Sequence, residues 1–95
     1  MQIDHQTVAD LCARNGIERL RLFGSFAKDE ASDDSDVDLL ADFVDRKSLM
    51  DLARIEREFA EKLGRKVDLL TERALSPYLR ERILKEAMVV FERAA

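Results

Sequence analysis

IERLRLFGSFAKDEASDDSDVDLLADF, residues 17–43, is the stretch around which the rest of the chain is organised. Its two ends, residues 17–23 and 37–43, are apolar runs of strand-like composition. The segment between them opens with Gly24-Ser25 and closes with aspartates. We therefore expect a glycine-serine turn at the end of one strand to lie close to the acidic start of the next.

Asp36 and Asp38 form a carboxylate pair at the start of the second run. Residues two apart on a strand point to the same face, so both carboxylates would reach one or two cations. Like charges at this spacing repel each other, which raises a pKa or attracts a divalent metal. Oxygen ligands suit Mg²⁺ better than Zn²⁺, and Mg²⁺ commonly takes substrate phosphates as its remaining ligands.

The turn beside this pair has the features of an anion site. Gly24 allows a close approach to the backbone, and Ser25 can cap a short helix formed by residues 26–28. Backbone N–H groups and a hydroxyl would then face the gap between the strands. The acidic loop that follows, residues 29–35, contains no apolar residue larger than alanine and is expected at the surface.

A calcium loop is a competing interpretation of the same aspartates. Asp34, Asp36 and Asp38 copy the opening of an EF-hand, and Asp45 falls at its twelfth position. Leu39, however, stands where that loop needs glycine, and the apolar alternation is typical of a strand. We therefore favour the strand.

The chain after the second run has the pattern of a crossover connection. Ser48 and Asp51 form a capping box for a helix that ends near Leu63. Another apolar run, residues 67–70, follows that helix, which makes a strand there parallel to the strand at 37–43. The predicted core stripe of the helix is Leu49, Leu52, Ala53, Ile55, Phe59 and Leu63.

Asp68 lies inside this third run, where a buried charge would be costly unless it met a cation. On the parallel neighbour of the strand that carries Asp36 and Asp38, its carboxylate could complete a cluster of three. The alternative is an exposed aspartate that pairs with Lys66 at the surface.

Helices are expected at both ends of the chain. The first ends at Gly16, and the last begins at Ser76-Pro77 and packs onto the sheet. The expected order is therefore αβαβαβα, an α+β fold with a three-stranded mixed sheet in a single domain, residues 1–95. The apolar stripe of the last helix is Leu79, Ile83, Leu84, Ala87, Val90 and Phe91.

The composition limits the classes of function. The formal net charge is −4 with 38% charged residues, so extended binding to nucleic acid is not expected. One cysteine excludes an internal disulfide, and no apolar run approaches the ~20 residues that span a bilayer. We expect a cytoplasmic protein without a membrane partner, whose exposed sheet edge would allow a homo-oligomer.

A glycine-serine turn followed by Asp36-x-Asp38 on a strand resembles the nucleotidyltransferase superfamily that includes DNA polymerase β and the kanamycin nucleotidyltransferases. The short chain and the wording LFGS…SDVDLL are similar to the minimal nucleotidyltransferases, the MntA-type antitoxins encoded beside a HEPN-domain toxin. The resemblance covers nearly the whole chain and implies a polymerase β-like nucleotidyltransferase core.

The resemblance also implies roles. Asp36, Asp38 and Asp68 would bind two Mg²⁺ ions, and Asp68 would accept the proton of the attacking hydroxyl. Gly24, Ser25 and Lys28 would position the phosphates of ATP. The implied reaction moves AMP from ATP to a hydroxyl and releases pyrophosphate, with a tyrosine of a HEPN toxin as the acceptor.

The turn departs from the family's usual Gly-Ser-Arg-Ala-Arg-Gly. Here Phe26 and Lys28 replace the arginines and Asp29 replaces the last glycine, so the loop is acidic where a triphosphate would arrive. A second hypothesis is therefore a binding antitoxin that neutralises its partner by contact. A nucleotidyltransferase with a small-molecule acceptor is a third, and the short chain argues against it.

Overall fold

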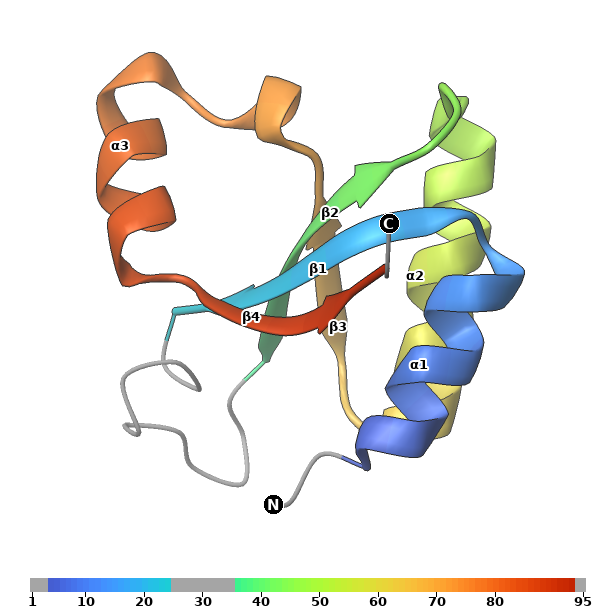
Figure 1. The fold of residues 1–95 in the computed structure, drawn as a ribbon. Coiled ribbons are helices and arrows are strands. Elements are labelled where there is room, and N and C mark those ends of the chain that lie inside the picture. The colour runs from blue at the N-terminus through green and yellow to red at the C-terminus, as the bar shows by residue number, and fades with distance from the viewer. Residues whose placement is uncertain (1–3, 25–35, 94–95) are drawn as a thin grey trace.

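A computed structural model of the chain describes residues 4–24 and 36–93. Within those ranges, three α-helices, four strands and one short 3₁₀ helix are formed (Figure 1). In chain order these are α1 (His5–Arg14), β1 (Ile17–Phe23), β2 (Val37–Phe43), α2 (Leu49–Leu63), β3 (Val67–Leu70), η1 (Glu72–Ala74), α3 (Pro77–Glu86) and β4 (Met88–Glu92).

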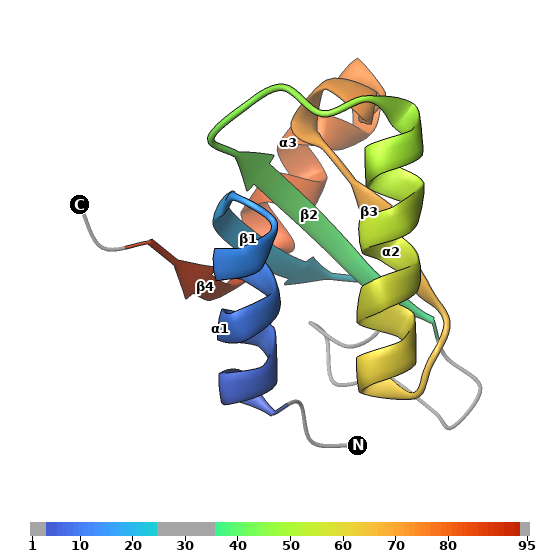
Figure 2. The ribbon, with the colours of Figure 1, turned by 90° about the vertical axis from the view of Figure 1, so that its right-hand side faces the viewer.

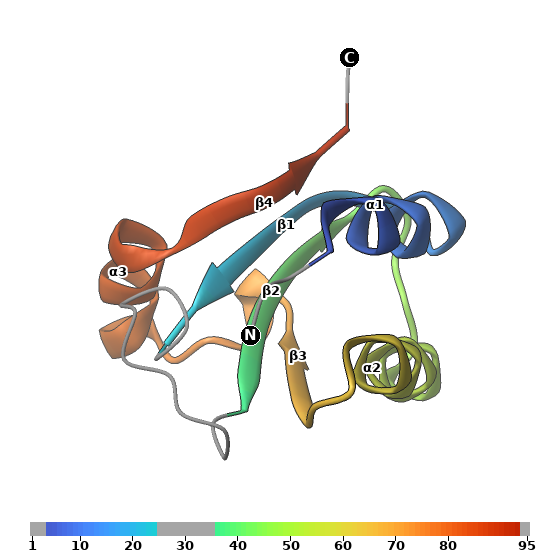
Figure 3. The ribbon, with the colours of Figure 1, turned by 90° about the horizontal axis from the view of Figure 1, so that it is seen from below.

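The strands form one mixed sheet in the order β3-β2-β1-β4. β2 is parallel to β3, whereas β1 is antiparallel to both β2 and β4. Helices α1 and α2 cover one face of the sheet, and α3 lies on the other side (Figure 3). The core between the sheet and the first two helices is built on fully buried side chains such as Leu20, Ile55 and Phe59.

The bounds predicted for the first three strands are confirmed, as is the parallel pairing of the second and third. Helix α2 begins with the predicted capping box, in which Ser48 Oγ accepts from the N–H of Asp51 and the Asp51 carboxylate accepts from the N–H of Ser48. Gly64 ends this helix in the left-handed region. The EF-hand is excluded because Leu39 lies within β2.

The predictions for the C-terminal part are wrong in two respects. The last helix ends at Glu86, and Met88–Glu92 form a fourth strand beside β1 rather than a helical stripe. Met88-Val89-Val90-Phe91 is a run of strand-forming side chains, and pairing with β1 satisfies its backbone. Helix α3 also contains no buried residue, so its apolar stripe does not pack onto the sheet as expected.

Two further differences concern the predicted elements. Leu49 and Ala53, assigned to the core stripe of α2, are exposed, because the buried stripe of this helix is centred on Ile55 and Phe59. The short helix expected at residues 26–28 lies outside the described residues, so the observed order is αββαβηαβ. Within residues 4–24 and 36–93, none of the helices has the length and apolar content needed to cross a bilayer.

Candidate active site

Three aspartates lie at the edge of the sheet where β2 and β3 begin. Asp38 and Asp68 are directly opposite each other in the parallel register, so their side chains share a face. Asp36 lies two residues before Asp38, on the same face by the period of two. All three therefore lie on the face opposite to the α1 and α2 core, as the expectation of a three-carboxylate cluster requires.

The proximity of the carboxylates is visible in the electrostatics of Asp38. Burial raises the pKa of Asp38, and the negative charges of Asp68 and Asp36 raise it further, as does a hydrogen bond with Asp68. Each of these effects disfavours the ionised form. A cation beside Asp38 would reverse the balance, because it would compensate the charges that repel one another.

Gly24 brings the end of β1 against this cluster. Its φ of +75° lies in the left-handed region, and a Cβ built on it would overlap Oδ2 of Asp38. The preceding residue, Phe23, is opposite Asp38 in the antiparallel register. Any residue other than glycine would therefore strain the backbone and displace the carboxylate. The glycine expected to allow close approach is in contact with the site.

Lys66, the surface partner considered above for Asp68, pairs with Asp36 instead. Lys66 Nζ lies 3.8 Å from Oδ2 of Asp36, and the lysine side chain is 76% exposed. Such a solvent-exposed ion pair contributes little to stability and separates easily. The ion pair with Lys66 therefore does not prevent Asp36 from binding a cation.

The donor chemistry of the cluster fits magnesium. Three carboxylates from two neighbouring strands supply hard oxygen ligands, and the raised pKa of Asp38 marks a repulsion that a divalent cation would relieve. Among the described residues, no group of three or more Asp, Glu, His or Cys side chains is placed to hold a metal ion as it stands. Binding a metal would therefore require side-chain rotation, with Asp36 released from Lys66.

Of the six residues singled out from the sequence, the structure brings four together: Gly24, Asp36, Asp38 and Asp68. Ser25 and Lys28, the other two expected phosphate contacts, lie outside the described residues.

Glu56 supports the site and was not singled out from the sequence. Its carboxylate on α2 accepts a hydrogen bond of 2.8 Å from the backbone N–H of Leu69, the residue after Asp68. This contact caps a backbone donor on the edge strand β3 and fixes the strand to the helix. Its spacing in the sequence could have indicated this role, because Glu56 lies four residues after Leu52 and three before Phe59, on the inward side of the helix.

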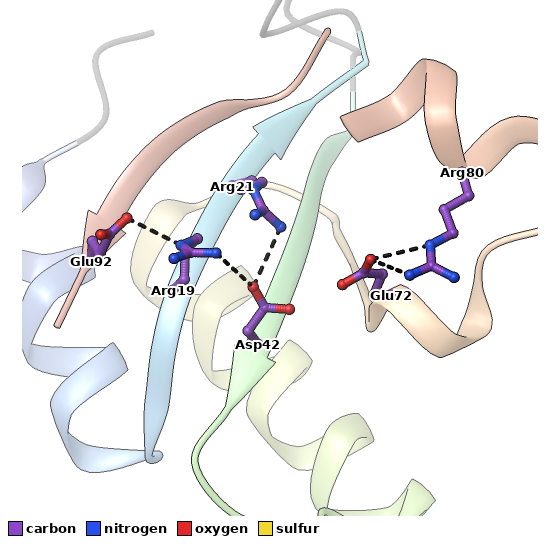
Figure 4. Close-up of polar contacts among 6 residues, drawn as sticks. All are labelled: Arg19, Arg21, Asp42, Glu72, Arg80 and Glu92. Atoms are coloured by element: carbon purple, nitrogen blue, oxygen red, sulfur yellow. Dashed lines mark hydrogen bonds and ion pairs between the residues drawn. The ribbon is translucent and has the colours of Figure 1, made fainter. Parts of the chain in front are cut away.

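A network of ion pairs extends over the same sheet face away from the aspartates (Figure 4). Arg21 and Arg19 place guanidinium nitrogens 3.3 and 3.9 Å from Oδ2 of Asp42, and Arg19 also lies 3.1 Å from Glu92. The Arg21 side chain is 17% exposed, so the network is part of the sheet surface.

Comparisons with known proteins find a matching family model and several related sequences. The family model described as polymerase beta, nucleotidyltransferase matches residues 6–95. The protein adenylyltransferase MntA of Thermococcus cleftensis is 35% identical over 81 residues, which are 85% of this chain and 82% of that protein. MJ0435 of Methanocaldococcus jannaschii, provisionally named a protein adenylyltransferase, is 41% identical over 83 residues, or 87% of this chain and 89% of its own.

Solved structures show the same fold. One provisionally described as a minimal nucleotidyltransferase has a TM-score of 0.77 at 46% identity, over 88% of this chain and 86% of its own. A toxin-antitoxin structure with AMP-PNP has a TM-score of 0.83 at 19% identity, over 96% and 75%. A tri-AMPylated HEPN toxin from Shewanella oneidensis in complex with its MNT antitoxin gives 0.72 at 19%, over 94% and 70%.

Proposed function

The chain belongs to the polymerase beta nucleotidyltransferase family, and from this premise we propose that it is a protein adenylyltransferase that acts as an antitoxin. It would transfer AMP from ATP to a tyrosine hydroxyl of a cognate HEPN-domain toxin and release pyrophosphate. The observation that carries the proposal is the cluster of Asp36, Asp38 and Asp68 on one sheet face, closed on one side by Gly24.

Asp36, Asp38 and Asp68 would hold Mg²⁺, two ions in the proposed complex. Bound magnesium would offset the negative charge of the ATP phosphates and of the leaving pyrophosphate. The raised pKa of Asp38 supports this assignment, because the cluster carries more negative charge than its surroundings compensate. Lys66, at 3.8 Å from Asp36, is the described cation that the metal would displace.

The chain's own groups would carry the remaining steps. The hydroxyl oxygen of the acceptor forms a bond to the α-phosphorus, the bond from that phosphorus to the pyrophosphate oxygen breaks, and the hydroxyl proton passes to the Asp68 carboxylate. Gly24, with no side chain, leaves room for the Asp38 carboxylate beside the end of β1. Ser25 and Lys28 would contact the phosphates.

The names of related proteins support a protein hydroxyl as the proposed acceptor of AMP. The T. cleftensis relative is a protein adenylyltransferase, and a structurally similar S. oneidensis antitoxin was solved with a tri-AMPylated HEPN toxin. Carboxylates presented on one sheet face also suit a partner protein that brings the acceptor hydroxyl to them.

A contact antitoxin without transfer is the second candidate. The observations that favour it are the loop substitutions Phe26 and Asp29, together with the pairing of Asp36 to Lys66 in place of a closed ligand set. In that case neutralisation would depend on the surface of the chain and not on its aspartates.

Labelled ATP, Mg²⁺ and the purified HEPN-domain toxin proposed as partner test the proposal. We expect label on a toxin tyrosine with the wild type and with Asp10→Asn, an exposed control on α1, and no label with Asp36→Asn. Absence of label with the wild type would refute the transferase. If the Asp36→Asn variant still inhibits the toxin without labelling it, the chain is a contact antitoxin instead.

A further inference from the structure

A second concave site lies at the opposite end of β2 from the aspartates. It is a hollow of ≈ 570 Å³ lined by the end of β2, the loop to α2, the first turns of α2 and residues 71–73 after β3. Figure 2 shows the loop between β2 and α2 and the chain leaving β3 at the same end of the molecule. From Asp38 to Phe43 the distance along the strand is roughly 17 Å, at about 3.3 Å per residue.

The charges that line this hollow are predominantly positive once the existing ion pairs are counted. Asp42 is already held by the arginines of β1, and Glu72 accepts two hydrogen bonds from Arg80 (Figure 4). Arg46 and Arg73 form no ion pair with any residue in the described ranges. The hollow thus presents basic groups on a chain whose formal net charge is −4.

Two other lining charges complete this balance. Lys47 places its ammonium 5.8 Å from the centre of the Phe43 ring, and Asp45 has no ion pair with another described residue. The charge of Lys47 also acts on the carboxylate of Asp51, so within the described part of the chain Arg46 and Arg73 are the two unpaired cations that stand against one uncompensated carboxylate. The hollow therefore favours an acidic occupant.

The rim of the hollow is apolar and exposed. Leu49, in the first turn of α2, is 84% exposed, and Val44, just after β2, is 49% exposed. Exposed apolar side chains beside a charged hollow are typical of contact surfaces, and Arg is enriched in protein interfaces. A small anion in the hollow would leave both rim side chains in water, so the combination favours a protein segment.

Resting on the proposed function, we infer that this hollow is the docking site for an acidic segment of the toxin that carries apolar side chains. Its carboxylates would meet Arg46 and Arg73, while its apolar side chains cover Leu49 and Val44. A partner anchored here needs to extend roughly 17 Å along the sheet to present a hydroxyl to Asp38. The hollow would thus set which protein is modified, and the aspartates would set the reaction.

The test compares two kinds of disrupting variant with matched controls. Arg46→Glu/Arg73→Glu reverses the charge of the hollow, and Arg57→Glu reverses an exposed arginine on α2 away from it. Leu49→Ser removes a rim side chain, and Leu79→Ser removes an exposed apolar side chain on α3. Thermal unfolding confirms that each variant is folded. Affinity for the purified HEPN toxin is measured by calorimetry without ATP, so the surface is tested whether or not AMP is transferred.

We expect the dissociation constant to rise at least about tenfold for Arg46→Glu/Arg73→Glu and for Leu49→Ser, and to stay within about twofold for both controls. In transfer assays the charge-reversed variant should show a raised KM for toxin with kcat unchanged. Wild-type affinity in either disrupting variant, or no binding of toxin by the wild type, would overturn the inference. ATP binding that is lost in the charge-reversed variant, with toxin affinity unchanged, would assign the hollow to a small anion and overturn it too.

Discussion

Replacing Gly24 by alanine tests the contact between the end of β1 and Asp38. The backbone at Gly24 has φ of +75°, and a left-handed conformation costs a residue with a side chain about 1–2 kcal/mol. The added Cβ would also overlap Oδ2 of Asp38, so the carboxylate has to move. Gly24→Ala should therefore lose stability through its backbone and activity through Asp38.

Gly64→Ala is the matched control for the backbone part of this effect. Gly64 has φ of +68°, and a Cβ built there has no other atom within 4 Å. Both variants should lose about 1–2 kcal/mol, which lowers Tm by about 4–8 °C per kcal/mol in a domain of this size. Any additional loss in Gly24→Ala comes from the displaced carboxylate.

The assay is AMP transfer to the purified HEPN toxin, with thermal unfolding measured on the same samples. A displacement on the order of 1 Å at a reacting group costs about 10²-fold, so kcat/KM should fall at least that far in Gly24→Ala. Gly64→Ala should retain kcat/KM within about twofold. Equal transfer by the two variants would refute the argument that Gly24 is required for the position of Asp38.

Two further predictions concern the supports and the charges of the site. Glu56→Ala removes the acceptor for the N–H of Leu69 and should lower the free energy of unfolding by about 1.5–3 kcal/mol in urea titrations. The control Glu61→Ala, at an exposed position on α2, should change it by less than about 0.5 kcal/mol. Equal effects of the two substitutions would contradict the role of Glu56. The raised pKa of Asp38 means that the folded chain binds a proton more tightly than the unfolded chain, so stability falls as pH rises through the raised value. Without divalent cations, Asp38→Asn should therefore unfold at a higher urea concentration than the wild type at neutral pH and at the same concentration in strong acid. A less stable Asp38→Asn at neutral pH would contradict the repulsion within the cluster.

Local signals in the sequence were sufficient for β1, β2, β3 and α2. Strand alternation, the Ser48-Asp51 capping box and the left-handed Gly64 are each determined by neighbours in the chain. Because the crossover fixes β3 as the parallel neighbour of β2, the placement of Asp68 with Asp36 and Asp38 also followed from the pattern.

Features that depend on distant partners did not follow from the sequence. Residues 88–92 continue an apolar stripe of helical spacing, and their pairing with β1, about 70 residues earlier in the chain, makes them a strand. Asp36 pairs with Lys66 because the sheet places the start of β3 beside the start of β2, although α2 lies between them in the chain. Arg21 pairs with Asp42 across the β1–β2 ladder. The hollow could not be predicted, since its walls come from the end of β2, the start of α2 and the chain after β3.

Calorimetric titration of Mg²⁺ with a non-hydrolysable ATP analogue tests the three-carboxylate site most directly. Wild type and Asp45→Asn should bind with equal affinity, and Asp68→Asn, altered on the strand next to the Asp36-Asp38 pair, should lose at least about tenfold. Wild-type affinity in Asp68→Asn would contradict the account, because the third carboxylate would then play no part in holding the metal.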